Sequence, residues 1–154
     1  MKRRALLGVM GLLAGGLLAV AGRGTAGDDR KADHPHAGHF DACAKACTAC
    51  LRACESCARH CAHLVAEGKK DYLLTLGTCA DCGDICATAA KVAARQGPLA
   101  VSVCEGCARA CDQCGAACEK FPHDQHMASC AKECRACARA CRDMIKHAGP
   151  EKPW

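Results

Sequence analysis

The sequence predicts an all-α fold, an antiparallel up-down-up-down four-helix bundle with a cysteine-lined core. Three observations carry this prediction. The 18 cysteines of the 154-residue chain fall into four runs, and every step within a run is three or four residues, which is the spacing of one face of an α-helix. Breaks that contain Gly or Pro separate the runs. Ala, Lys, Arg, Glu and Asp dominate the positions between cysteines, which favours helices with a solvated outer face.

The four runs place helices near residues 41–66, 71–96, 98–120 and 122–147. Their cysteines are Cys43, Cys47, Cys50, Cys54, Cys57 and Cys61; Cys79, Cys82 and Cys86; Cys104, Cys107, Cys111, Cys114 and Cys118; and Cys130, Cys134, Cys137 and Cys141. Asp41 is suited to cap the first helix and Gly97 to end the second. Pro98 and Pro122 suit the first turns of the third and fourth helices. The short connections favour antiparallel neighbours.

One sequence element recurs in this region. Residues 43–54, 107–118 and 130–141 share the pattern C-A-[KR]-x-C-x-x-C-x-x-A-C. Residues 82–93 are a degenerate copy in which Ala89 and Ala93 take the last two cysteine places. The second helix therefore has fewer thiols, and we expect its lower-numbered half, near Tyr72 and Leu76, to pack as apolar core.

The first 26 residues read as an export signal. Residues 2–4 are basic, residues 5–21 are apolar and small residues follow, with cleavage expected after Ala21 or Ala26. Residues 3–7, Arg-Arg-Ala-Leu-Leu, resemble a twin-arginine signal, which exports folded proteins. The alternative is an uncleaved anchor, although 17 residues are at the short end of the ~17–25 that span a bilayer. We expect residues 27–40 to be a polar linker, 41–147 the bundle and 148–154 a tail.

The net charge of +5 does not indicate a nucleic-acid partner. Four basic residues and no acidic ones precede residue 27, so the remainder carries 17 basic residues (21 − 4) against 16 acidic ones. No basic face is implied, and 3% aromatic content disfavours base stacking. After cleavage of the signal no membrane association is expected either.

Eighteen inward thiols allow several interpretations. A bundle lined only by Cys and Ala packs thinly, which argues against cysteine as a mere hydrophobe. A disulfide scaffold suits an exported, cysteine-dense chain, but cysteines stacked on one helix are poorly placed to pair with each other. Structural zinc needs only four ligands per ion, and the ferredoxin cysteine run of iron–sulfur proteins is absent from the sequence. Cu(I) is soft and selects thiolates; bound by two or three of them, it suits a continuous row of cysteines about 5–6 Å apart.

On these cysteine runs, residues 41–147 resemble the four-helix-bundle copper storage proteins, and the leader makes the chain similar to their exported branch. The resemblance implies a bundle that binds many Cu(I) ions through every cysteine from Cys43 to Cys141. It also implies a homotetramer.

Histidines and methionines are expected at both ends of the bundle. The register of the fourth helix extends backward from Cys130 to Met127 and His123, and forward from Cys141 to Met144. Thioether and imidazole both bind Cu(I), so these three are further candidate ligands; the alternative for the methionines is flexible packing.

The remaining histidines divide between the two ends. An antiparallel bundle gathers His60, His63, His123 and His126 at one end, and His147 with the linker histidines at the other. The linker histidines, His34, His36 and His39, are expected to be a solvated tail.

The sequence thus predicts a periplasmic Cu(I) storage or sequestration protein, exported by the twin-arginine route, that is not an enzyme. Copper chaperones or copper enzymes are the expected protein partners. The alternatives are a disulfide-stabilised structural or redox bundle, and a zinc or general heavy-metal sponge.

Overall fold

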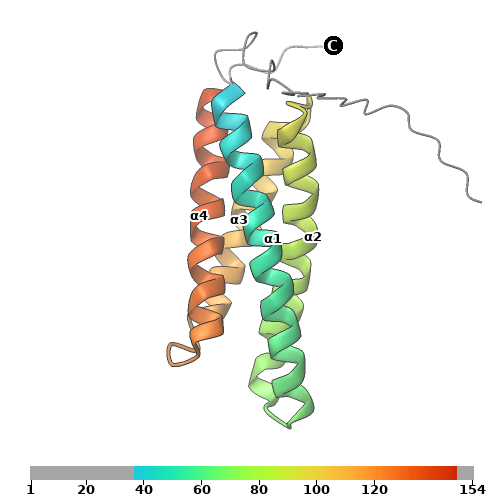
Figure 1. Cartoon of the computed structure of the whole chain (residues 1–154), viewed down its shortest axis with the longest axis vertical. Coiled ribbons are helices and arrows are strands. Elements are labelled where there is room, and N and C mark those ends of the chain that lie inside the picture. Colours follow the sequence, from blue (N-terminus) through green and yellow to red (C-terminus); the bar gives the residue numbers. More distant parts are fainter. Residues whose placement is uncertain (1–36, 149–154) are drawn as a thin grey trace, which may run out of the picture.

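The computed structural model describes residues 37–148, which form four antiparallel helices packed in a ring (Figure 1). They are α1 (Ala37–Ala66), α2 (Leu73–Ala94), α3 (Ala100–Cys118) and α4 (Gln125–His147), with a 3-10 helix, η2 (Lys70–Tyr72), before α2. Each helix packs against the next along the chain, and α4 packs against α1. The predicted four-helix bundle is confirmed.

The two ends of the bundle are each named after one histidine that lies there. The His39 end, at the top of Figure 1, holds the start of α1, the end of α2, the start of α3 and the end of α4. The His60 end holds the two turns that join α1 to α2 and α3 to α4. In Figure 1 the α1–α2 hairpin reaches further at the His60 end than the α3–α4 hairpin does.

The first helix begins earlier than the sequence predicts. Residues 37–40, expected as the last part of a polar linker, form the first turn of α1. Asp41 therefore does not cap the helix but lies within it, with its carboxylate 2.7 Å from Lys45 Nζ. Tertiary contacts explain the difference, because Phe40 packs against the core and His39 contacts Asp143 on α4.

The end of α2 also differs from the prediction. Gln96, not Gly97, takes the left-handed conformation after the helix, with φ of 51°. The Gly97 N–H donates to the Val92 carbonyl at 3.0 Å, which closes the last turn. A Cβ at position 97 would lie 3.3 Å from Val92 Cγ1, a tight contact to which the valine side chain would have to adjust.

The two prolines precede α3 and α4 instead of starting them. Pro98 is two residues before α3 and Pro122 three residues before α4. The residue that caps the start of α4 is Asp124, whose Oδ1 accepts hydrogen bonds from the backbone N–H groups of His126 and Met127 at 2.9 and 3.3 Å.

Near the His60 end, apolar side chains replace thiols on α2. Tyr72 and Leu76 are partly buried against the core, as the sequence predicts. The Tyr72 ring stacks on Phe121, with ring centroids 4.1 Å apart, so an aromatic pair covers this side of the interior. Within residues 37–148 no helix combines the length and apolarity needed to cross a membrane.

Candidate metal centre

The interior of the bundle is a column of thiols. Every one of the 18 cysteines is buried, none more than 2% exposed, and all are free thiols. The one-face spacing of the sequence produces this arrangement directly, because each helix turns its cysteine face toward the other three. Ala89 and Ala93, fully buried on α2, continue the seam at the His39 end without a sulfur.

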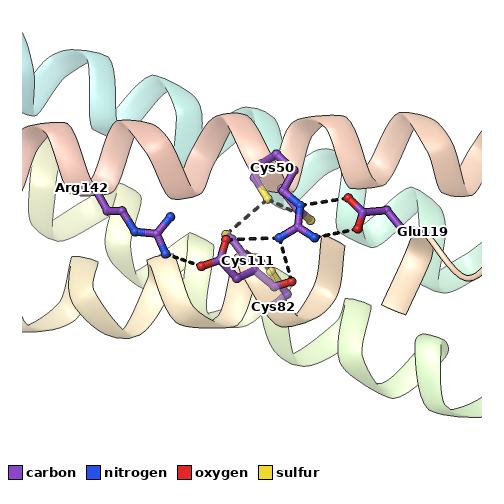
Figure 2. A network of polar contacts seen from close by, with 8 residues as sticks. Cys50, Cys82, Cys111, Glu119 and Arg142 are labelled. Atoms are coloured by element: carbon purple, nitrogen blue, oxygen red, sulfur yellow. Dashed lines mark hydrogen bonds and ion pairs between the residues drawn. The ribbon is translucent and has the colours of Figure 1, made fainter. Parts of the chain in front are cut away.

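Thiols from different helices lie in contact along the column. The Sγ atoms are 3.6 Å apart in Cys47–Cys137 between α1 and α4, and in Cys86–Cys111 between α2 and α3. Figure 2 shows Cys50, Cys82 and Cys111 meeting in the interior; Cys111 Sγ lies 3.8 Å from the Sγ atom of each of the other two.

These contacts build groups of four sulfurs, each with all Sγ atoms within 4.8 Å of one another. Five such groups are Cys47/Cys107/Cys137/Cys141, Cys50/Cys82/Cys86/Cys111, Cys50/Cys54/Cys82/Cys134, Cys54/Cys114/Cys130/Cys134 and Cys57/Cys79/Cys118/Cys130. Neighbouring groups share members; Cys54 and Cys134, for example, each belong to two of these five groups. Isolated tetrahedral zinc sites need no shared ligands, whereas Cu(I) with two or three thiolates per ion uses a continuous, shared set.

Contacts between neighbouring thiols move their pKa values in both directions. They raise the pKa of Cys54, the largest effect coming from Cys114, and lower the pKa of Cys82, the largest effect coming from Cys111. Burial raises the pKa of Cys61 to about 11. A soft cation that binds the column must displace the proton of each sulfur that is still a thiol.

Each end of α4 places a buried methionine next to the thiols. Met127 is fully buried, and its Sδ lies 3.4 Å from Cys57 Sγ. Met144 is fully buried one helical step beyond Cys141. Both methionines face the interior as the register predicts, so the thioethers continue the column of sulfur at its two ends.

The third residue predicted from that register, His123, does not face the interior. It is exposed in the turn before α4 and lines a surface hollow of about 570 Å³ together with Tyr72 and Phe121. The prediction of an inward His123 was wrong because α4 begins only at Gln125, so its register cannot extend that far back.

The His60 end instead holds a fixed pair of histidines. The rings of His60 and His126 stack with centroids 4.6 Å apart. Asp124 Oδ2 lies 2.8 Å from His60 Nε2, and Ser56 Oγ lies 2.9 Å from His126 Nε2. The sequence predicts that these histidines gather here, but it does not single out Asp124 as the residue that joins them to the start of α4.

A second histidine pair lies at the His39 end. The rings of His39 and His147 stack with centroids 3.8 Å apart and an interplanar angle of 4°. Asp143 Oδ2 is 2.9 Å from His39 Nδ1, and its Oδ1 is 3.7 Å from His147 Nδ1. His39 is therefore not part of a solvated tail as expected. His34 and His36 lie outside the described residues.

Charged side chains hold α3 to α4 on the outside of the column. The Arg135 guanidinium donates two hydrogen bonds to the Glu119 carboxylate, at 2.9 and 2.7 Å, and two to Asp112, at 3.1 Å to its main-chain oxygen and 3.3 Å to Oδ1. Arg142 also binds Asp112. Figure 2 shows Glu119 and Arg142 on either side of this network, and Arg135, Arg142, Asp112 and Glu119 are each at least 33% exposed, whereas the thiols are buried. The ionic contacts are thus kept apart from the sulfur interior.

Comparison with known proteins places this column in a family. Residues 36–146 match the family model for copper storage proteins. A copper storage protein from Streptomyces lividans, loaded with 10 copper equivalents, is 27% identical with a TM-score of 0.66; the match covers 71% of this chain and 86% of that one. The apo form of copper storage protein 3 from Bacillus subtilis is 37% identical with a TM-score of 0.57, over 68% of this chain and 96% of that one.

Further relatives extend this likeness. The cysteine-rich protein YhjQ of Bacillus subtilis is 36% identical over 64 residues, and the match spans 42% of this chain and 58% of the relative's length. Other solved relatives are the Cu(I)-bound protein BsCsp3 and a cytosolic Streptomyces lividans copper storage protein with five coppers. A model match over most of the chain, joined to a bundle whose interior is made of free thiols, identifies the chain as a member of the copper storage protein family.

Proposed function

We propose that this chain stores Cu(I), holding many ions on the thiolates of the column. One observation carries the proposal: 18 free thiols line one interior in overlapping groups of four. Cu(I) bound by two shared thiolates has a limiting stoichiometry of about one ion per cysteine, because each sulfur serves two ions. Met127 and Met144, which extend the row of sulfur, pass ions between solvent and the thiolates.

Anaerobic Cu(I) titration followed by native mass spectrometry tests this function. We expect saturation at well over ten ions per chain, a ligand-sharing estimate. Saturation at two to four ions would contradict storage and favour discrete zinc-like sites, and a parallel Zn(II) titration separates the two outcomes. After copper removal under anaerobic conditions, all 18 cysteines should react with an alkylating agent. Nine stable disulfides in their place would indicate the scaffold alternative.

The second part of the proposal is export to the periplasm by the twin-arginine route. The support is the basic, apolar and small-residue order of residues 1–26 and the Arg-Arg pair at positions 3 and 4. One Streptomyces relative is a cytosolic protein, so the proposal of export rests on the leader alone. Replacing both arginines with lysine and fractionating cells expressing the full chain tests it; the bundle should then stay in the cytoplasm.

We also propose that the protein is a homotetramer that supplies copper chaperones or copper enzymes without itself catalysing a reaction. The exposed apolar side chains of Leu73, Leu74 and Ile85 on α2 support association of subunits. Light scattering after size exclusion measures the mass directly, and a 16.0 kDa species at micromolar concentration would contradict a stable tetramer.

A further inference from the structure

The His39 end carries a set of metal ligands that differs in kind from the thiol column. His39, Asp143 and His147 offer two imidazoles and a carboxylate. Nitrogen and oxygen donors suit borderline ions and the tetragonal coordination of Cu(II), whereas thiolates suit Cu(I). The bundle therefore presents ligands for both oxidation states of copper. At the His39 end the two kinds of ligand lie close to each other.

Two of these donors already have the spacing that one ion requires. Donor atoms that bind a single ion at about 2.0–2.1 Å lie about 3 Å apart, and His39 Nδ1 and Asp143 Oδ2 are 2.9 Å apart. His147 Nδ1 lies 3.7 Å from Asp143 Oδ1 and 2.8 Å from the Asp143 main-chain oxygen, so the His147 ring must turn away from that oxygen to join the ion. All three residues are more than a third exposed, with Asp143 at 56%, so an ion from solvent reaches them without opening the bundle.

The reducing groups lie one helical turn below this site. His39 precedes Cys43 by four residues on α1, about 6 Å along the axis, and Met144, the residue after Asp143, is fully buried. Cys43 Sγ is 3.7 Å from the Sγ atoms of both Cys104 and Cys141. The seam of α2 provides alanine at this level, so these are the first thiols that an electron acceptor at the His39 end meets.

We infer that the His39 end binds Cu(II) and that the thiols beneath it reduce the ion to Cu(I) before storage. Two Cu(II) ions each take one electron, and two thiols lose their protons and join in one disulfide. The balance is 2 Cu(II) + 2 RSH → 2 Cu(I) + RS–SR + 2 H⁺. Cys43 is one partner of the disulfide, and Cys104 or Cys141 is the other. The remaining thiols hold the two Cu(I) ions, so this step rests on the proposed storage function and consumes thiols stoichiometrically.

The His60 end lacks these properties, although it also holds two histidines and an aspartate. Asp124 Oδ1 accepts two backbone N–H groups at the start of α4, and its Oδ2 contacts His60. His126 Nε2 contacts Ser56 instead of the carboxylate. The Asp124 side chain is only 17% exposed. The Asp124 carboxylate caps α4 and is far less exposed than that of Asp143, which makes the His60 end a matched control for the His39 end.

The test is anaerobic mixing of the full-length, thiol-reduced protein with a Cu(II) salt, with the Cu(II) signal followed by freeze-quench electron paramagnetic resonance. We expect the Cu(II) signal to decay with formation of one disulfide per two ions, mapped by mass spectrometry to Cys43. The double variant His39→Ala/His147→Ala should slow the decay about tenfold or more, because the ion is no longer held beside the thiols. The matched double variant His60→Ala/His126→Ala should decay at the wild-type rate.

A second variant keeps the test decisive if reduction also occurs elsewhere. Replacing Cys43, Cys104 and Cys141 with alanine, the residue that already occupies the α2 seam at this level, should trap Cu(II) with a nitrogen and oxygen signal that the two histidine substitutions abolish. Three results would overturn the inference: equal decay in both double variants, a disulfide confined to the Cys57 and Cys79 layer, or stable Cu(II) in the wild type. Cu(I) titration of the same samples reports storage separately, so a failure of reduction is distinguished from a failure of storage.

Discussion

At the scale of single residues, the methionines at the ends of α4 are the clearest link between packing and copper movement. Both are fully buried in line with the thiols. Met127→Leu and Met144→Leu keep the volume and should each cost less than about 1.5 kcal/mol of stability. A thioether stays unprotonated and binds Cu(I) more weakly than thiolate, so it passes ions inward.

Neither substitution should change the Cu(I) capacity. The substitution at the end of the bundle through which copper enters should slow Cu(I) uptake, or its removal by a chelator, as measured by stopped-flow. Cys57 Sγ already lies 3.4 Å from Met127 Sδ, which provides the path there. Unchanged rates in both variants would mean that the methionines only fill space.

Asp124 allows a pH prediction at the same scale. Burial raises its pKa, but hydrogen bonds from His60 and from the backbone N–H groups of Met127 and His126 outweigh burial, and the pKa lies below its ordinary value. A depressed folded-state pKa gives stability that is present above the unfolded-state pKa of about 3.9 and is lost as pH falls through the folded-state value.

Asp124→Ala removes both the cap and the contact with His60, and should lower the free energy of unfolding by about 1–2 kcal/mol at pH 7. Asp124→Asn keeps a capping oxygen and should lose less. The loss relative to wild type should shrink as pH falls below about 4, measured by urea unfolding at each pH. A loss that is constant down to pH 2 would exclude the carboxylate charge as its source.

At the scale of elements, the sequence predicts which residues form helices far better than where the helices end. Cysteine steps of three and four establish both the helices and their inward faces, because no other regular structure has that period. The ends depend on contacts that spacing does not reveal. Residues 37–40 join α1 because His39 meets Asp143, 104 positions away, and His123 leaves the column because Asp124 caps the start of α4.

The end of α2 gives a prediction about one such boundary. Gln96 occupies a left-handed conformation that disfavours residues with a Cβ. Gln96→Gly should raise the free energy of unfolding by about 0.5–1 kcal/mol, after the greater flexibility of glycine in the unfolded chain is subtracted. Thermal unfolding by circular dichroism measures the gain. Gly68 provides the comparison, because it also has a positive φ, 89°, after the end of α1, and Gly68→Ala should destabilise.

At the scale of the whole molecule, the bundle should fold without metal. Alanine and charged residues on the outer faces favour helix, and the described interior is closed by cysteine, alanine and methionine. The apo protein should therefore show a helical far-ultraviolet spectrum that changes little on Cu(I) addition. A coil spectrum that becomes helical only with metal would mean that binding supplies the folding energy, as in zinc fingers.

The column has an electrical consequence. Among residues 37–148, Thr75 is the one polar side chain counted as buried, and no charged group lies in the interior. Each Cu(I) that displaces one thiol proton exchanges one monovalent cation for another, so filling at one ion per sulfur leaves the net charge of the protein unchanged. The field outside the bundle is then the same empty or full, and a native gel should not separate the two forms by charge. Protons therefore compete with copper for the sulfurs, and a lower pH favours release, because every ion released requires one proton in return.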